Sequence, residues 1–149
     1  MKYLILVICI SLSSFAYSQD ANFNLEEGYV AKGYDVVAYF DKKAVEGKEE
    51  FSTTHNGLNL KFSSQKNLDK FNTNPEHYLP QYGGWCAYAL AISEDKVDIN
   101  PEAFEIRDDK LYLFYKTFPV NTLKKWKKKN PEKLRDQADR NWTKISPEN

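Results

Sequence analysis

The chain has 149 residues, 42% of them hydrophobic and 15% aromatic, and its 21 lysines and arginines balance 21 acidic residues. This length fits one domain. Six glycines and six prolines, together with the aromatic and hydrophobic content, exclude a collagen-like, disordered or multi-spanning membrane chain. A formal net charge of zero gives no overall attraction to a strongly charged partner, so we do not expect nucleic-acid binding.

The first 18 residues have the layout of a secretory signal peptide. Lys2 precedes an apolar run over 3–12, and Ala16 and Ser18 are small residues at the third and first positions before a cut. The run is too short to span a bilayer core of about 30 Å. We therefore predict a bacterial protein that is periplasmic or secreted after cleavage near Ser18, with no integral membrane segment left. An uncleaved anchor and lipidation at Cys9 stay open as alternatives.

Cleavage would leave 131 residues and one cysteine, Cys86, because Cys9 lies in the leader. A single thiol excludes an internal disulfide and a metal cage built only from cysteines. An exposed free thiol outside the cytoplasm is at risk of oxidation. We therefore expect Cys86 to be buried, bound to a ligand or shielded in a pocket.

The first half of the mature chain predicts an arm, a buried strand and a hairpin. Residues 19–32 form the N-terminal arm, whose polar first half we expect to be loose. The nearly unbroken apolar run over 34–40 indicates a buried strand. Residues 51–62 alternate around Asn56 and Gly57, a pair typical of a hairpin turn with two positive φ angles. The apolar face of the hairpin is Leu58, Leu60 and Phe62.

Four helix starts follow from capping residues. Ser63 or Ser64 can cap a helix directly after the hairpin. The triplet Asn-Pro-Glu then begins at Asn74, Asn100 and Asn130. In this triplet Asn can accept from a free helix N–H, Pro suits the first helical position, and Glu favours the positive helix end. We therefore predict a helix after each of the three.

The second half predicts another hairpin and a C-terminal helix. Residues 104–107 and 111–114 alternate around a polar turn, and Leu134, Ala138 and Trp142 recur at intervals of four. The predicted fold class is therefore α+β, a small antiparallel sheet of hairpins with packed helices. The lysine run over 124–129 contains Trp126. We interpret it as a solvated amphipathic helix with its tryptophan inward, in preference to a nucleic-acid or anionic-membrane contact.

The most unusual stretch places Gly83 and Gly84 between Tyr82 and Trp85, directly before Cys86. Paired glycines occur where the backbone turns sharply or is approached closely. Two interpretations remain open. The stretch is either a binding wall of aromatic faces, glycine backbone and a soft sulfur ligand, or a part of the core in which the thiol is a small buried hydrophobe.

The histidines give weaker indications. His55 adjoins the hairpin turn, where we expect it to face solvent, and His77 lies nine residues before Cys86. We favour a structural role for His77, with a shared metal or a thiol–imidazole nucleophile as alternatives. The sequence contains no nucleophile elbow, phosphate loop, dinucleotide fingerprint or zincin motif. A non-enzymatic protein is therefore favoured.

Several of these segments, in this order, resemble the YHS domain family. The segments are 33–40, 56–57, 62–64, 68–71 and 74–79. The stretch 82–89 is similar to exported bacterial members of that family. The resemblance covers 33–142, which we take as the domain, leaving 1–18 as signal peptide, 19–32 as arm and 143–149 as tail. It implies a small metal-binding module.

The family's metal ligands do not carry over residue by residue. Cysteine-bearing members place thiols where this chain has Ala38, Ser63 and Asn67. Thiolates supply much of the affinity for soft metals. The resemblance therefore implies the scaffold, with Cys86 as the one soft ligand of the mature chain.

These observations predict an exported, non-enzymatic binding domain. Its pocket is bounded by Tyr34, Asp35, Tyr82, Gly83, Gly84, Trp85 and Cys86. The ligand would be a small organic molecule or a transition metal such as copper or zinc, held by Cys86 with help from His77. The alternatives are a thiol-dependent enzyme or redox protein using Cys86, and an accessory module that docks through its basic C-terminal helix. The cofactor and the protein partner are unknown.

Overall fold

β-Hairpins and the helices that pack on them make up residues 22–146, the part of the chain that the computed structural model describes. The predicted signal peptide, with Cys9 and the cleavage site, lies outside the described residues, as do the last three residues of the predicted tail. No helix in the described part is long and apolar enough to cross a membrane. The mixed composition of helices and small sheets confirms the predicted α+β class.

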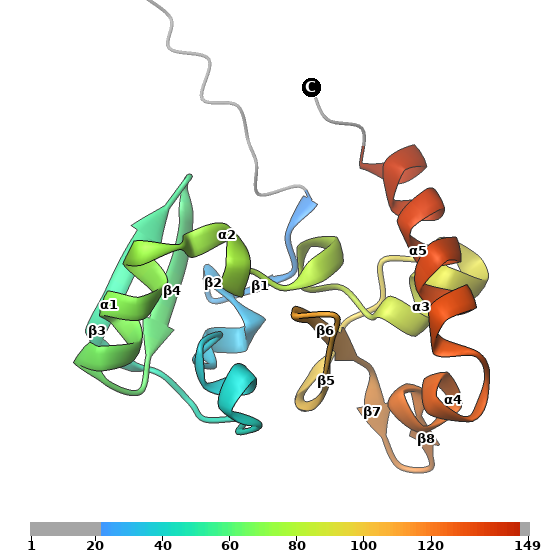
Figure 1. The fold of residues 1–149 in the computed structure, drawn as a ribbon, viewed down its shortest axis with the longest axis horizontal. Coiled ribbons are helices and arrows are strands. Elements are labelled where there is room, and N and C mark those ends of the chain that lie inside the picture. The colour runs from blue at the N-terminus through green and yellow to red at the C-terminus, as the bar shows by residue number, and fades with distance from the viewer. Residues whose placement is uncertain (1–21, 147–149) are drawn as a thin grey trace, which may run out of the picture.

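The elements follow one another in two groups. The first contains β1 (Leu25–Glu26), β2 (Tyr29–Val30), β3 (Lys48–His55), β4 (Leu58–Phe62), α1 (Gln65–Thr73) and α2 (Pro75–Tyr78). The second contains α3 (Ala87–Ser93), β5 (Asn100–Arg107), β6 (Lys110–Phe114), β7 (Lys116–Thr117), β8 (Val120–Asn121), α4 (Thr122–Lys128) and α5 (Pro131–Ile145). Figure 1 shows the β3–β4 hairpin with α1 on one side of the molecule, α3 to α5 on the other, and the β5–β6 hairpin between them.

Both predicted hairpins are confirmed. Asn56 and Gly57 have φ angles of 49° and 82°, and β3 and β4 pair on either side of them. Leu58, Leu60 and Phe62 are buried, as the alternation predicted. The β5–β6 turn consists of Asp108 and Asp109, with φ angles of 49° and 59°. In both turns two residues in the left-handed region match the twist of the flanking strands.

The N-terminal arm is packed where the structure describes it, which corrects the expectation of a loose segment. β1 pairs with β2, and β2 joins the first hairpin by a parallel contact between Tyr29 and Asn59. The side chain of Asn24 donates to Asp98 at 2.9 Å, and Lys32 donates to the same carboxylate at 2.8 Å. Burial opposes ionisation of Asp98, but these hydrogen bonds outweigh it and lower the pKa of that carboxyl. The sequence missed these contacts because they join residues more than 60 positions apart.

Two further predictions of local structure are wrong. Residues 34–40 are largely buried but do not form a strand, because the side chain of Asp35 turns the chain into a 3₁₀ helix over Ala38–Asp41. Asn100 begins β5 and not a helix. Its partner across the sheet is Phe114, so pairing with β6 overrides the local helix signal.

The remaining helix starts agree with the sequence. Ser64 caps α1 by accepting from the backbone of Asn67, and Asn130 caps α5 by accepting from the backbone of Lys133. α2 begins at Pro75 without a side-chain cap. The helix α5 runs to Ile145, three residues into the predicted tail.

The core is continuous between the two groups of elements. Its largest fully buried side chains are Tyr39, Phe62, Phe71, Tyr112, Phe114 and Trp126. Trp126 points inward as predicted, and its indole N–H donates to Glu105 at 2.7 Å. This anchor fixes which side of α4 faces the interior and which side faces solvent.

Candidate functional site

The carboxylate of Asp35 is the most heavily hydrogen-bonded group among the candidate residues, and the side chain is fully buried. Its Oδ2 accepts from the backbone N–H of Ser63 at 2.8 Å, from the Ser63 hydroxyl at 2.6 Å and from the Asn67 amide at 2.7 Å. Its Oδ1 accepts from the backbone N–H groups of Val37 and Ala38, at 2.9 and 3.1 Å. Five donors converge on one carboxylate, whose two oxygens act only as acceptors when it is ionised. Asp35 therefore joins its own turn to the β4–α1 junction by charge-assisted hydrogen bonds.

The donors around Asp35 include the positions where the family resemblance implies thiols. Ala38 contributes its backbone N–H, Ser63 its hydroxyl and backbone, and Asn67 its side-chain amide. A methyl, a hydroxyl and an amide do not supply the thiolates that a soft metal prefers. Within residues 22–146 no group of three or more His, Cys, Asp or Glu side chains could hold a metal ion. The residues present therefore fit a buried carboxylate centre and do not fit the family's metal.

Cys86 is buried, with an exposed fraction of 0%. Burial was one of the three alternatives expected from the sequence. Its sulfur lies 3.3 Å from the hydroxyl of Thr122 and accepts from the backbone N–H of Tyr115, also at 3.3 Å. The Thr122 hydroxyl has one proton, which it donates to the carbonyl of Tyr115 at 2.7 Å. The thiol must then donate to Thr122, so the neutral S–H satisfies this arrangement and joins the start of α3 to the base of the β7–β8 hairpin.

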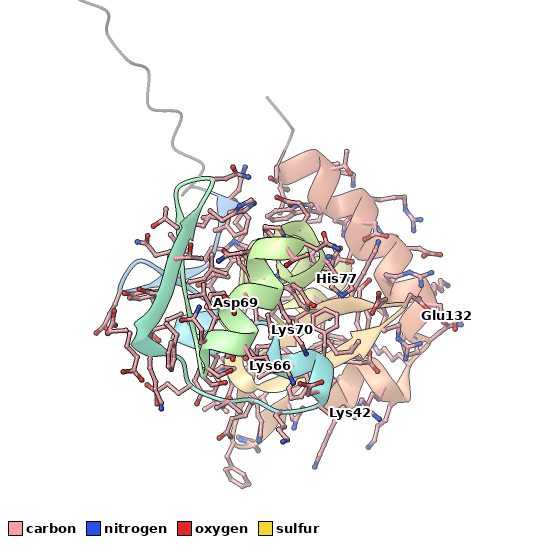
Figure 2. All side chains as sticks on the ribbon, turned by 60° about the vertical axis from the view of Figure 1, so that its left-hand side comes forward. Lys42, Lys66, Asp69, Lys70, His77 and Glu132 are labelled. Carbon is pink, nitrogen blue, oxygen red and sulfur yellow. The ribbon has the colours of Figure 1, made fainter. Side chains whose placement is uncertain are left out.

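His77 has a different set of neighbours from Cys86. Its ring packs against Phe40 and Tyr78, with ring centroids 4.8 and 4.6 Å apart, and its Nδ1 lies 3.6 Å from a carboxylate oxygen of Asp109. Figure 2 shows His77 on the side of the molecule that carries α1. These contacts supply the structural role that the sequence favoured. A metal shared by Cys86 and His77 stays a prediction.

His55 is more enclosed than a freely solvated turn residue. Its side chain is 24% exposed, and its Nε2 lies 2.8 Å from a carboxylate oxygen of Glu76. The ring also meets Phe71 edge-on, with centroids 5.9 Å apart. These contacts connect the first hairpin to α1 and α2.

The paired glycines are covered by the chain's own N-terminal segment. A side chain at Gly83, where φ is 60°, would collide with the carbonyl of Asn22. Asn24 donates from its backbone to Gly83 at 2.8 Å, and the indole of Trp85 donates to Asn22 at 3.1 Å. Glycine is needed here so that another part of the same backbone can approach. This contact accounts for the motif without a ligand.

The residues predicted to bound one pocket have separate partners. Tyr82 donates from its hydroxyl to Asp139 on α5 at 2.7 Å, and burial together with this bond raises the pKa of Tyr82. Tyr34 forms an isolated bridge with Glu46. Asp35 faces the β4–α1 junction, as described above. Ligand binding by the whole set stays a prediction.

The exposed apolar surface at the β7–β8 turn was not predicted from the sequence. Phe118 at the β7–β8 turn is 97% exposed, and Val120 beside it is also exposed. The available signal was a short apolar segment, Phe-Pro-Val, which lies between Lys116 and Lys124 without helical or strand periodicity.

Comparison with known proteins finds one similarity. A family model described as YHS domain matches residues 36–82. The match begins one residue after Asp35, includes Ala38, Ser63 and Asn67, and ends before Cys86. No curated protein and no solved structure matches the chain significantly. The similarity confirms the YHS resemblance over 36–82, while its extension to residue 142 and the exported branch stay predictions.

Replacing Asp35 by asparagine should destabilise the fold. The new side-chain amide would place an N–H donor where a carboxylate oxygen now accepts hydrogen bonds, and the charge-assisted bonds would be lost. We therefore expect the free energy of unfolding to fall by about 3 kcal/mol. Urea denaturation measures this loss. The matched control is Asp41→Asn, an exposed residue in the adjacent 3₁₀ helix, for which we expect a change within about 0.5 kcal/mol. Equal losses in the two variants would show that the Asp35 hydrogen bonds do not stabilise the fold more than an exposed carboxylate does.

The Cys86 thiol should react with an aromatic disulfide reagent only when the protein unfolds. Cys9→Ser in the same chain makes Cys86 the single thiol, and the rate of reaction is followed at increasing urea concentrations. A control chain with Cys9→Ser, Cys86→Ser and Asn72→Cys places one thiol on the exposed side of α1, where immediate reaction is expected. Rapid reaction of Cys86 in the native protein would contradict the sealed arrangement and favour a reactive thiol.

Proposed function

We propose that the chain is an exported, non-enzymatic domain of the YHS type that acts as an accessory binding module through its surface. The family match over residues 36–82 supports the type, and the order of residues 1–18 supports export. The observation that carries the proposal is a contrast between the interior and the surface. The interior polar groups are satisfied, whereas α4 presents unpaired cations to solvent.

The buried polar side chains of the described residues already have hydrogen-bond partners within the protein. Over the described residues, no buried side-chain nitrogen or oxygen lacks a hydrogen-bond partner. Binding and catalytic pockets generally depend on a few polar groups directed at the ligand. Asp35 directs its carboxylate at five internal donors, and Cys86 directs its thiol at Thr122. A thiol-dependent enzyme or redox protein, which needs an accessible thiolate, has less support from this arrangement.

The surface of α4 has the opposite character. Trp126 faces the core, and at 100° per residue Lys124 and Lys128 then face directly away from it, with Lys125 and Lys127 at the sides. All four lysines are exposed, and none forms an ion pair within residues 22–146. Unpaired cations on one helix attract an anionic partner and make the attraction sensitive to salt.

The proposal predicts retention of the protein by an anionic component of the cell envelope. We expect the chain, produced in a bacterium with its own leader, to sediment with the envelope fraction at low salt and to be released at high salt. A variant with Lys124→Gln, Lys125→Gln, Lys127→Gln and Lys128→Gln should remain in the soluble fraction. Quantitative immunoblotting of the two fractions measures the difference.

A matched control removes four lysines from another face. Lys42, Lys43, Lys66 and Lys70 lie on or beside α1 and the 3₁₀ helix Ala38–Asp41, and Figure 2 shows Lys42, Lys66 and Lys70 on that face. Their replacement by glutamine changes the net charge by the same amount and should leave retention unchanged. Equal loss in both variants would mean that only net charge matters, and the α4 surface would then have no specific role.

A further inference from the structure

We infer that the β7–β8 hairpin and α4 together form a docking face for an anionic membrane surface. The docking face comprises Lys116, Phe118, Pro119, Val120, Lys124, Lys125, Lys127 and Lys128. The inference rests on the proposed surface-binding function and names the partner. It combines two features of the described structure, an exposed apolar tip and a cationic helix adjacent to it in the chain.

The apolar tip is the first feature. Phe118 is 97% exposed and Val120 is 37% exposed, and the other large hydrophobic side chain exposed within residues 22–146 is Ile92 on α3. The pairs Lys116–Asn121 and Thr117–Val120 leave Phe118 and Pro119 as the turn itself. Figure 1 shows this hairpin projecting from the edge of the molecule beside α4. Transfer of an exposed phenylalanine side chain from water into an apolar phase is favourable.

The base of the hairpin is fixed to the interior. The backbone of Thr122 donates to Tyr115 at 3.0 Å, and the thiol of Cys86 contacts both residues. The side chain of Asn100 also donates to the carbonyl of Lys116 at 3.4 Å. The buried Cys86 therefore packs against the base of the hairpin and holds it in place, while the tip projects into solvent.

The charge around the tip is the second feature. Residues 110–131 contain seven lysines and no acidic residue. Lysines near an anionic lipid surface each add attraction, and their long side chains can keep the charge at the headgroups while an apolar group inserts. Exposed lysines also occur on and beside α1, at Lys42, Lys43 and Lys66, but no large exposed hydrophobic side chain accompanies them within residues 22–146. The combination distinguishes the docking face from that region.

A membrane fits this face better than a folded acidic protein. Stable protein interfaces bury about 800 Å² on each partner and depend on shape complementarity. Here the apolar contribution comes from the tip of one hairpin, while Trp126 is fully buried and unavailable. A fluid lipid surface needs no matching shape and accepts a single inserted side chain among anionic headgroups.

Vesicle flotation tests the inference with protein expressed from the full-length sequence, so that every variant carries the same N-terminus. We expect binding to vesicles of phosphatidylcholine and phosphatidylglycerol, weaker binding at high salt, and much weaker binding to phosphatidylcholine alone. Phe118→Ser should lower the partition coefficient roughly tenfold or more. The four-lysine α4 variant should lower it further. Phe118→Trp should show a blue shift of its emission when phosphatidylglycerol vesicles are added.

The controls keep the outcomes distinct. Ile92→Ser removes an exposed hydrophobic side chain from α3. The control variant at Lys42, Lys43, Lys66 and Lys70 removes the same charge as the α4 variant, so both controls should bind like the unmodified chain. Thermal unfolding of Phe118→Ser should be unchanged because the side chain packs against little. Equal binding of all variants, or none to phosphatidylglycerol vesicles, would overturn the inference. If envelope retention still depends on the α4 lysines in that case, the proposed function stands and the partner is an acidic protein.

Discussion

The buried carboxylate of Asp35 is the interaction on which the matched YHS segment depends. It holds the turn over residues 35–38 against the β4–α1 junction with five hydrogen bonds. Burying an ionised carboxylate is costly unless its lone pairs are fully satisfied. Ser63 and Asn67 supply that satisfaction at positions where the family resemblance implies thiols. The chain thus has a local organising centre that needs neither sulfur nor a metal.

The same principle extends to the second half of the chain. Cys86, Thr122 and Tyr115 form a smaller buried network that fixes the start of α3 to the base of the β7–β8 hairpin. The paired glycines admit the N-terminal segment instead of a ligand. Cys86 and the paired glycines, which the sequence offered as candidate site residues, therefore join separate parts of the fold. Within residues 22–146, the α4 lysines and Phe118 at the hairpin tip lie on the outside, exposed to solvent.

The sequence predicted those parts of the fold that depend on neighbouring residues. Both hairpin turns, the caps at Ser64 and Asn130, and the inward position of Trp126 follow from local spacing and side-chain chemistry. Long-range contacts were beyond its reach. The strand expected over 34–40 failed because Asp35 bonds to its own turn and also to Ser63 and Asn67, which lie 28 and 32 residues away. The helix expected after Asn100 failed because pairing with β6 decided its conformation. The separate partners of Tyr34, Asp35 and Tyr82 are long-range contacts of the same kind.

Amide hydrogen exchange at Ser63 and Ala38 tests the central claim most directly, because both N–H groups donate to Asp35 in the structure. If the carboxylate organises this region alone, both amides exchange as slowly as the amides of β4, and adding zinc or copper(I) changes neither rate. Fast exchange in the metal-free protein, followed by protection when a metal is added, would contradict the account.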